Sequence, residues 1–265
     1  MTIIREGGYL AADGSRIEIA AEVAAAVAGT RLFTPEQLAR LLCVPGGAGV
    51  HPAFEVTDEL SQEAARRMAI DEGHENVLLL NFASAKIAGG GFLAGAKAQE
   101  EDLARASALY SCLLPASEYY SRNRSCGHLV YTDHMIASPR VPFFRVEART
   151  LLERPFLATV ITAPAPNALA CERVWPHELA GLDYEAVLRR RAGMVLALAQ
   201  ELGCRQLVLG AWGCGVFRND PKLVADAFGR WLEHPRFAGA FDRVVFAIWG
   251  RIGANRAAFE RRFAG

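Results

Sequence analysis

Residues 77–101 read VLLLNFASAKIAGGGFLAGAKAQEE, and this stretch decides the fold. The opening VLLLNFA is a continuous apolar run, which is typical of a strand that a parallel sheet buries on both faces. A glycine-rich loop follows, and QEEDLARASALYSCLL (99–114) is predicted to be a helix. A buried strand, a loop and a helix in this order form the basic unit of an α/β protein.

The same alternation continues on both sides of this stretch. We predict strands at PAFEVTD (52–58), LATVITAP (157–164), QLVLGAW (206–212) and RVVFAIWG (243–250). We predict helices at SQEAARRMAIDEG (61–73), DYEAVLRRRAGMVLALAQELG (183–203), DPKLVADAFGRWLE (220–233) and ANRAAFERRF (254–263). Strands that alternate with helices imply a three-layer α/β/α fold with a mixed, largely parallel central sheet.

The N-terminal segment has a different pattern. Residues 15–43 show apolar and charged positions at helical spacing, and Thr34-Pro35 is a favourable helix start because threonine caps and proline fits the first turn. Pro45-Gly46-Gly47 then breaks the chain. We therefore expect a helical N-terminal extension over 1–48, packed on a catalytic domain that spans 49–265.

The segment from Ser117 to Arg154 is also less regular. It carries clustered aromatic residues, prolines at 139 and 142, and a further proline at 155. We interpret it as a long insertion packed over the sheet, where loops that shape a substrate site often lie.

Composition limits the classes of ligand. The chain is 52% hydrophobic and 22% charged, and its 29 lysines and arginines balance 29 aspartates and glutamates. A protein that attracts a polyanion at long range normally carries a basic surplus. We expect no direct DNA binding, and we expect a phosphate-bearing ligand to be held by backbone amides and short-range contacts.

The six cysteines are scattered and have no zinc-ligand spacing, so we expect reduced thiols and no metal site. The sequence has neither a secretory signal nor a run of roughly 18 apolar residues that could span a membrane. These features favour a cytoplasmic protein without membrane contact.

Two glycine-rich loops follow predicted strands, SAKIAGGGFLAGAKAQEE (84–101) and GCGVFRNDP (213–221). In open α/β folds, ligands bind beyond the carboxyl ends of strands, and glycines let backbone amides approach a phosphate closely. Two facing loops would form a diphosphate cradle. Each loop alone is as well explained by a tight turn, and neither matches a Walker or dinucleotide-binding motif.

Three glycines, seven residues and then Gln-Glu-Glu resemble the signature of poly(ADP-ribose) glycohydrolases. The blocks SPRVPFFR (138–145), VITAPAPN (160–167) and LGAWGCGVFRNDP (209–221) resemble the bacterial branch of that family, in the same order. The resemblance implies a macrodomain that cleaves the ribose–ribose bond of poly(ADP-ribose). Poly(ADP-ribosyl)ated proteins would be its partners, ADP-ribose its product, and reversal of ADP-ribosylation, as in the DNA damage response, its role.

The resemblance also implies roles for single residues. Glu101 matches the catalytic glutamate, and Glu100 matches the neighbour that holds the ribose. Expected ligand-binding residues are Asn81, Ser84, Gly89, Gly90, Gly91 and Gln99 in the first loop, and Gly213, Gly215, Val216 and Phe217 in the second. Animal members read Asp-Phe-Ala-Asn where this chain reads Asn81-Phe82-Ala83-Ser84, and this chain has one more residue in the loop.

The chemistry is physically reasonable. One carboxyl can protonate the leaving oxygen and then activate water. Glu100 and Glu101 are adjacent at a helix start, so their side chains diverge by about 100° and do not form an ordinary facing pair. A helix N-terminus favours the ionised form, whereas burial raises a carboxyl pKa, and we expect bound substrate to raise that of Glu101. The scheme demands neither metal nor cofactor, so full activity in chelator is expected.

Other residues allow two interpretations. Adenine could lie near Thr57-Asp58 or near the stretch 249–255, and Asn167 could line the pocket or cap a turn. The run Arg189-Arg190-Arg191 is typical of a solvated helix face. Cys214 has no evident base and is interpreted as a small loop residue. Two functional alternatives also remain, a non-catalytic ADP-ribose reader and a mono-ADP-ribosyl hydrolase.

Overall fold

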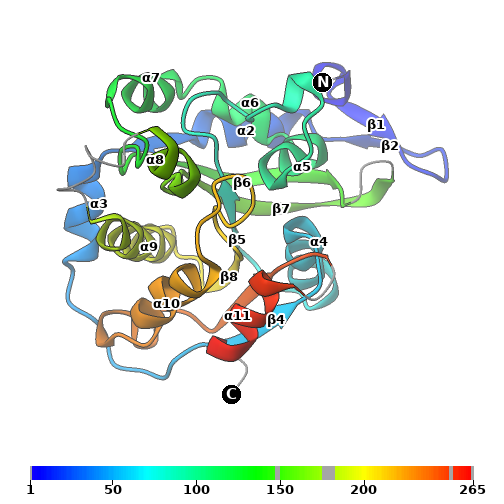
Figure 1. Cartoon of the computed structure of the whole chain (residues 1–265). Helices are drawn as coiled ribbons and strands as arrows, with labels where there is room; N and C mark the ends of the chain where they lie inside the picture. Colours follow the sequence, from blue (N-terminus) through cyan, green and yellow to red (C-terminus); the bar gives the residue numbers. More distant parts are fainter. Residues whose placement is uncertain (1, 147–149, 175–182, 251–252, 264–265) are drawn as a thin grey trace.

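The computed structural model describes residues 2–146, 150–174, 183–250 and 253–263, and its centre is a seven-stranded mixed sheet (Figure 1). The strand order is β3 (Arg31–Phe33), β6 (Met135–Arg145), β7 (Leu151–Ala163), β5 (Val77–Phe82), β8 (Gln206–Leu209), β9 (Arg243–Ala247) and β4 (Ala53–Thr57). Neighbouring strands from β7 through β5, β8 and β9 to β4 are parallel. The pairs β3–β6 and β6–β7 are antiparallel. The predicted three-layer architecture with a mixed, largely parallel sheet is confirmed.

Helices cover both faces of the sheet. One core packs between the sheet and α3 (Pro35–Leu42), α9 (Tyr184–Glu201), α10 (Pro221–Leu232) and α11 (Ala254–Phe263). The other packs against α2 (Ala20–Gly29), α4 (Ser61–Arg66), α5 (Gln99–Ala106), α6 (Leu109–Leu113) and α7 (Ser117–Ser125). None of the described helices is long and apolar enough to cross a membrane.

The N-terminal segment is only partly helical. After α1 (Thr2–Glu6), β1 (Gly8–Leu10) and β2 (Arg16–Glu18) form a separate two-stranded sheet, and β3 pairs with β6 in the main sheet. The helix start at Thr34 is confirmed, because its hydroxyl accepts from Gln37 N and Pro35 is the first helical residue. The expectation of a purely helical extension is corrected by the three strands.

Three further expectations need correction. The segment predicted as an irregular insertion contains α7, the long strand β6 and the first residues of β7, which pairs antiparallel with β6. The helix predicted over 99–114 stops at Ala106, because Ser107 is extended and forms an isolated antiparallel bridge with Phe143. The helix predicted over 61–73 changes at Arg67 into a π-helical turn that ends at Asp71.

The sheet order places the two glycine-rich loops together. Strands β5 and β8 are hydrogen-bonded neighbours and run in parallel. Their carboxyl ends therefore lie at the same edge of the sheet, and the loops that leave them flank one space.

Candidate active site

The Glu101 carboxylate binds the backbone of the first glycine-rich loop. Its Oε1 accepts from Gly91 N at 2.7 Å, and its Oε2 accepts from Ala98 N at 3.0 Å. The second contact is the reciprocal half of a capping box, in which the third residue of α5 satisfies an amide at the helix start. Glu101 is 7% exposed, so the loop holds the predicted catalytic carboxyl in one position.

Glu100 lies deeper and is held by other groups. It is 3% exposed, and its carboxyl accepts from Ser84 N at 2.6 Å and from Asn81 Nδ2 at 3.3 Å. Burial raises the pKa of Glu100 to about 8, and the neighbouring charge of Glu101 adds to this. The two hydrogen bonds favour the charged form but do not outweigh burial, so Glu100 is protonated at neutral pH.

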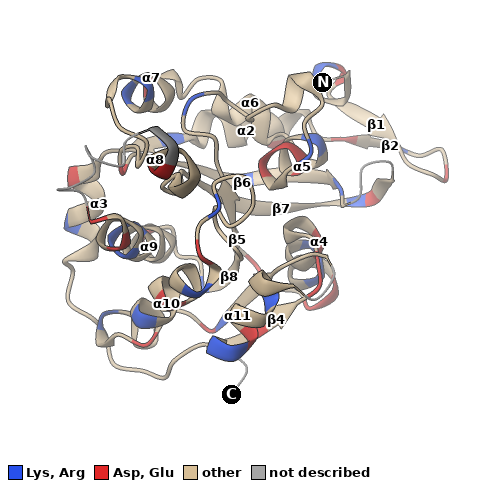
Figure 2. Cartoon of the chain, viewed as in Figure 1, with Lys and Arg blue, Asp and Glu red and all other residues tan. Residues whose placement is uncertain are grey.

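The two carboxyls approach each other at Gly90. A Cβ on Gly90 would collide with Glu101 Oε1 and lie 2.9 Å from Glu100 Oε2. Gly90 also has a φ of +58°, which disfavours any other residue. The loop therefore requires glycine here because its backbone lies directly against both carboxyls. Acidic residues colour the start of α5 in Figure 2.

Gln99 fixes α5 against the end of β5. Its Oε1 accepts from Phe82 N at 2.9 Å, and its Nε2 donates to Leu80 O at 2.8 Å and Ser61 Oγ at 3.2 Å. The Ser84 hydroxyl accepts from the amides of the two residues that begin the loop, Lys86 and Ile87. The side chains of Gln99 and Ser84 thus shape the loop, and Gln99 also borders the cavity described next.

A cavity of about 460 Å³ separates the start of α5 from the second loop. Gly213, Gly215, Val216 and Phe217 of the second loop line it, and so does Gln99 at the start of α5. Phe217 leans against Tyr131, with ring centroids 6.2 Å apart. Glu100, Glu101 and the glycine triplet do not line this cavity; they lie beside it. The structure thus divides the predicted site into a carboxylate cluster and an adjoining pocket.

The sequence did not predict Asn219, which holds the second loop closed. It is 2% exposed. Its backbone N–H donates to Gly213 O at 3.1 Å, and its side-chain Nδ2 donates to Trp212 O at 3.4 Å. Its Oδ1 accepts from Ala168 N, at the start of α8 (Ala168–Val174). Only the loop motif itself could have indicated this role.

The two stretches expected near adenine meet at a second cavity, of about 240 Å³. Glu59 to Gln62, just after the first stretch, line one side, and Trp249 and Asn255 line the other. Asp58 joins the stretches by accepting from Gly250 N at 2.8 Å. Residues 251–252 lie outside the described part of the chain.

Asn167 caps α8, since its Oδ1 accepts from Ala170 N.

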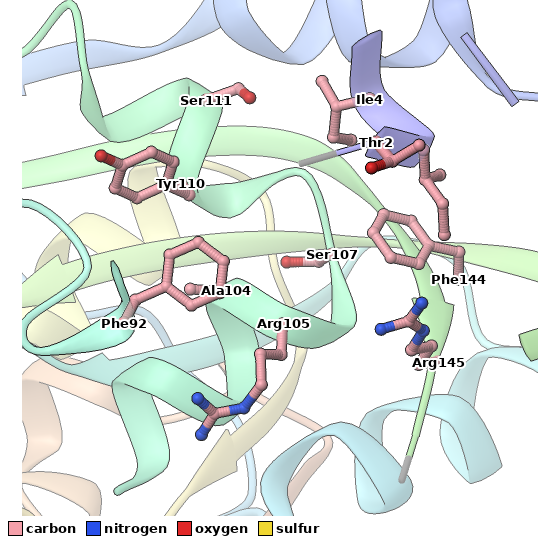
Figure 3. Close-up of a pocket in the computed structure, with 11 residues that line it drawn as sticks. Thr2, Ile4, Phe92, Ala104, Arg105, Ser107, Tyr110, Ser111, Phe144 and Arg145 are labelled. Carbon is pink, nitrogen blue, oxygen red and sulfur yellow. The ribbon is translucent and has the colours of Figure 1, made fainter. Parts of the chain in front are cut away.

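A further cavity of about 200 Å³ lies behind the first loop, between α1, the α5–α6 junction and β6 (Figure 3). Phe92 and Tyr110 form one wall, with ring centroids 5.2 Å apart, and a Cβ on Gly89 would meet the Tyr110 ring at 2.8 Å. Among the described residues its lining includes neither Glu100 nor Glu101. Its aromatic wall supports the glycine triplet from behind.

The arginine run differs from its predicted role. Arg191 is fully buried, and its guanidinium donates to Asp133 Oδ1 at 2.8 Å, Pro164 O at 2.8 Å and Tyr131 O at 3.1 Å. The prediction of a solvated face is therefore wrong for Arg191. Only three-dimensional packing brings Asp133 to this helix.

Burial raises the pKa of Cys214 to about 12, so this residue stays a thiol, in agreement with a loop role.

The sheet, the paired glycine-rich loops and the carboxyl pair at a helix start define a macrodomain-type hydrolase. The family model described as microbial-type PARG, catalytic domain, where PARG is poly(ADP-ribose) glycohydrolase, matches residues 1–146. The chain therefore belongs to the microbial-type poly(ADP-ribose) glycohydrolase family. The family and the fold expected from the sequence are both confirmed.

Solved structures agree with this assignment. The poly(ADP-ribose) glycohydrolase of Thermomonospora curvata, bound to the inhibitor ADP-HPD, is 46% identical, with a TM-score of 0.90 over 99% of this chain and 96% of that one. The enzyme of Deinococcus radiodurans in complex with ADP-ribose is 45% identical, with a TM-score of 0.83 over 91% of this chain and 96% of that one. A search of curated proteins finds no match.

Proposed function

We propose that this protein hydrolyses the ribose–ribose bonds of poly(ADP-ribose) and releases ADP-ribose, with Glu101 as general acid and base. The observation that carries the proposal is the convergence of two buried carboxyls on Gly90, beside a cavity that the second loop lines. A protein that only reads ADP-ribose needs the loops but gains nothing from burying two carboxyls together, because removing carboxyl groups from water is costly.

In the proposed reaction, Glu101 protonates the leaving ribose oxygen as the glycosidic bond breaks. The same carboxylate then takes a proton from the water that attacks the anomeric carbon. Glu100, protonated at neutral pH, holds a ribose hydroxyl and can donate as well as accept a hydrogen bond. Asn81 and Ser84 orient Glu100, and Gly91 and Ala98 orient Glu101.

We propose that the pocket holds the rest of the ligand. The backbone amides of Gly213 and Gly215 would bind the diphosphate, Phe217 would press on the distal ribose, and the cavity beside Trp249 would take adenine. We further propose that the substrate is carried by poly(ADP-ribosyl)ated proteins in the cytoplasm of a bacterium, including after DNA damage. Residues 1–48 would act as an extension of the catalytic domain formed by 49–265.

The test compares two substrates with the same protein. Purified poly(ADP-ribose) and a mono-ADP-ribosylated protein are each incubated with the wild type, and released ADP-ribose is quantified by chromatography. We expect release from the polymer while the last protein-linked ribose stays in place. Binding of ADP-ribose without any release would identify a reader, and efficient release from the mono-modified protein would identify a mono-ADP-ribosyl hydrolase.

A further inference from the structure

Lysine occurs only in the first glycine-rich loop and just after the second. The chain has 29 lysines and arginines, but lysine occurs only at Lys86, Lys97 and Lys222. Lys86 and Lys97 lie on either side of the glycine triplet in the first loop. Lys222 follows the second loop, in the first turn of α10. Basic residues elsewhere, such as those on α7 and α9 in Figure 2, are all arginine.

These lysines also differ from most arginines in their contacts. Within the described ranges, every Lys or Arg ion pair is made by arginine and none by lysine. All three lysines are exposed. Two exposed arginines accompany them, since Arg124 donates to Lys86 O at 2.7 Å and Arg218 lies in the second loop. The loops therefore carry cations that no described carboxylate neutralises.

We propose that Lys86, Lys97 and Lys222, with Arg124 and Arg218, form a cationic rim that holds the diphosphate of the polymer unit next to the one being released. The proposal rests on the glycohydrolase activity proposed above. Each polymer unit carries a diphosphate, and the balanced total charge of the chain gives no general attraction for it. Lys86, Lys222 and Arg218 lie outside the lining of both ligand cavities, so they are available to a second unit.

The choice of lysine has a physical reason. An ammonium group is a compact, strongly hydrated charge on a flexible stem, whereas guanidinium binds phosphate in a fixed, two-pronged geometry. After each cleavage the neighbouring unit must dissociate together with the shortened polymer. Mobile point charges suit such a transient contact better than a fixed two-pronged contact. The rim would thus raise the local concentration of polymer without slowing its release.

The experiment uses the double variant Lys86→Gln/Lys222→Gln, because neither side chain lines a cavity. The matched control, Arg31→Gln/Arg40→Gln, removes the same charge from exposed positions on β3 and α3. For each protein, kcat/KM on long poly(ADP-ribose) is measured from low to high salt, and the Kd for ADP-ribose is measured by calorimetry.

We expect kcat/KM of the rim variant to fall about ten-fold at low salt. In a plot of log kcat/KM against log salt concentration, the rim variant should have a slope about 1.4 shallower than the wild type. Each lost lysine contact with a flexible polyanion removes about 0.7 from this slope, and the variant loses two. The Kd for ADP-ribose should stay within about two-fold, because Lys86 and Lys222 lie outside the lining of both ligand cavities. The control should match the wild type in all three measurements.

Three results would overturn the rim: an equal loss of ADP-ribose affinity, an equal loss in the control, or unchanged kcat/KM and salt slope. If the wild type released no ADP-ribose from polymer, the proposed function would fail instead. Polymer binding by the wild type, the rim variant and the control would then test the rim independently of activity. Weaker and less salt-dependent binding by the rim variant would support it, and equal binding by all three would refute it.

Discussion

At the scale of single residues, the buried Glu100 makes stability depend on pH. Its pKa is about 8 in the folded protein and near the ordinary glutamate value of 4.5 when unfolded. The folded state therefore keeps a proton that the unfolded state loses, and the wild type loses stability as pH rises from about 4.5 to 8. The same burial that suits Glu100 to hold a ribose hydroxyl thus lowers stability at neutral pH.

Glu100→Gln removes this cost. We expect its Tm to exceed that of the wild type by about 8 °C at pH 8, and to equal it near pH 3, where the wild-type group is protonated in both states. Scanning calorimetry at the two pH values measures the difference. The exposed Glu118→Gln should show no pH-dependent gain. A gain of the same size at both pH values would contradict the raised pKa.

Gly90 and Gly95 separate backbone strain from contact with the carboxyls. Both have positive φ, but a Cβ on Gly95 meets nothing within 4 Å, whereas one on Gly90 collides with Glu101. Gly95→Ala should cost about 1 kcal/mol of stability, measured by urea unfolding, and Gly90→Ala should cost more because its Cβ also collides with Glu101. Only Gly90→Ala should lower kcat, by about 100-fold, because it displaces the reacting group. Equal kcat for the two variants would contradict the arrangement.

At the scale of elements, Arg191 joins α9 to the loop before β6 and to the end of β7. Replacing it with Met leaves Pro164 O and Tyr131 O without their donor and leaves Asp133 paired with Arg190 alone, so it should destabilise the fold by about 3 kcal/mol in urea unfolding. Arg189 belongs to the same run, but its side chain is 41% exposed and its ion pair is with the exposed Glu185. Arg189→Met should change stability by less than about 0.5 kcal/mol. Similar losses from both changes would refute the buried role of Arg191.

The sequence predicted elements well where the pattern was local. Buried strands such as β5 are uninterrupted apolar runs, and Thr34 caps its own helix. Prediction from the sequence failed where contacts between distant residues decide the structure. Pro139 and Pro142 suggested an irregular insertion, but a register shift between Ser138 and Val141 accommodates the chain within β6. The break at Ser107 depends on its bridge to Phe143, which helical periodicity does not reveal.

At the scale of the whole molecule, residues 1–48 contribute to the main core. Leu38 of α3 is buried on one face of the sheet, Ala26 of α2 on the other, and β3 covers the edge of β6. A fragment spanning 49–265 would expose this edge and both apolar patches, so we expect it to aggregate. Size-exclusion chromatography tests this. A monomeric fragment with cooperative unfolding would show that the extension is dispensable for folding.

The family, and a pair of adjacent carboxyls at a helix start, could be predicted from sequence because the glycine triplet and Gln-Glu-Glu lie within one short stretch. The division of the site could not. The cavity combines Gln99 with a loop more than a hundred residues later, and Tyr131 supports Phe217 only in the folded chain. The rim likewise depends on two loops becoming neighbours through β5 and β8.

The most direct test of the central claim is the release of ADP-ribose from poly(ADP-ribose) by Glu101→Gln, measured together with its Kd for ADP-ribose. Gln keeps the size of the side chain but cannot transfer a proton. The account predicts a fall in kcat of at least about 1,000-fold, within the range expected for general acid–base catalysis, and a Kd within a few-fold of the wild type. Release at the wild-type rate would show that Glu101 is not the catalytic group.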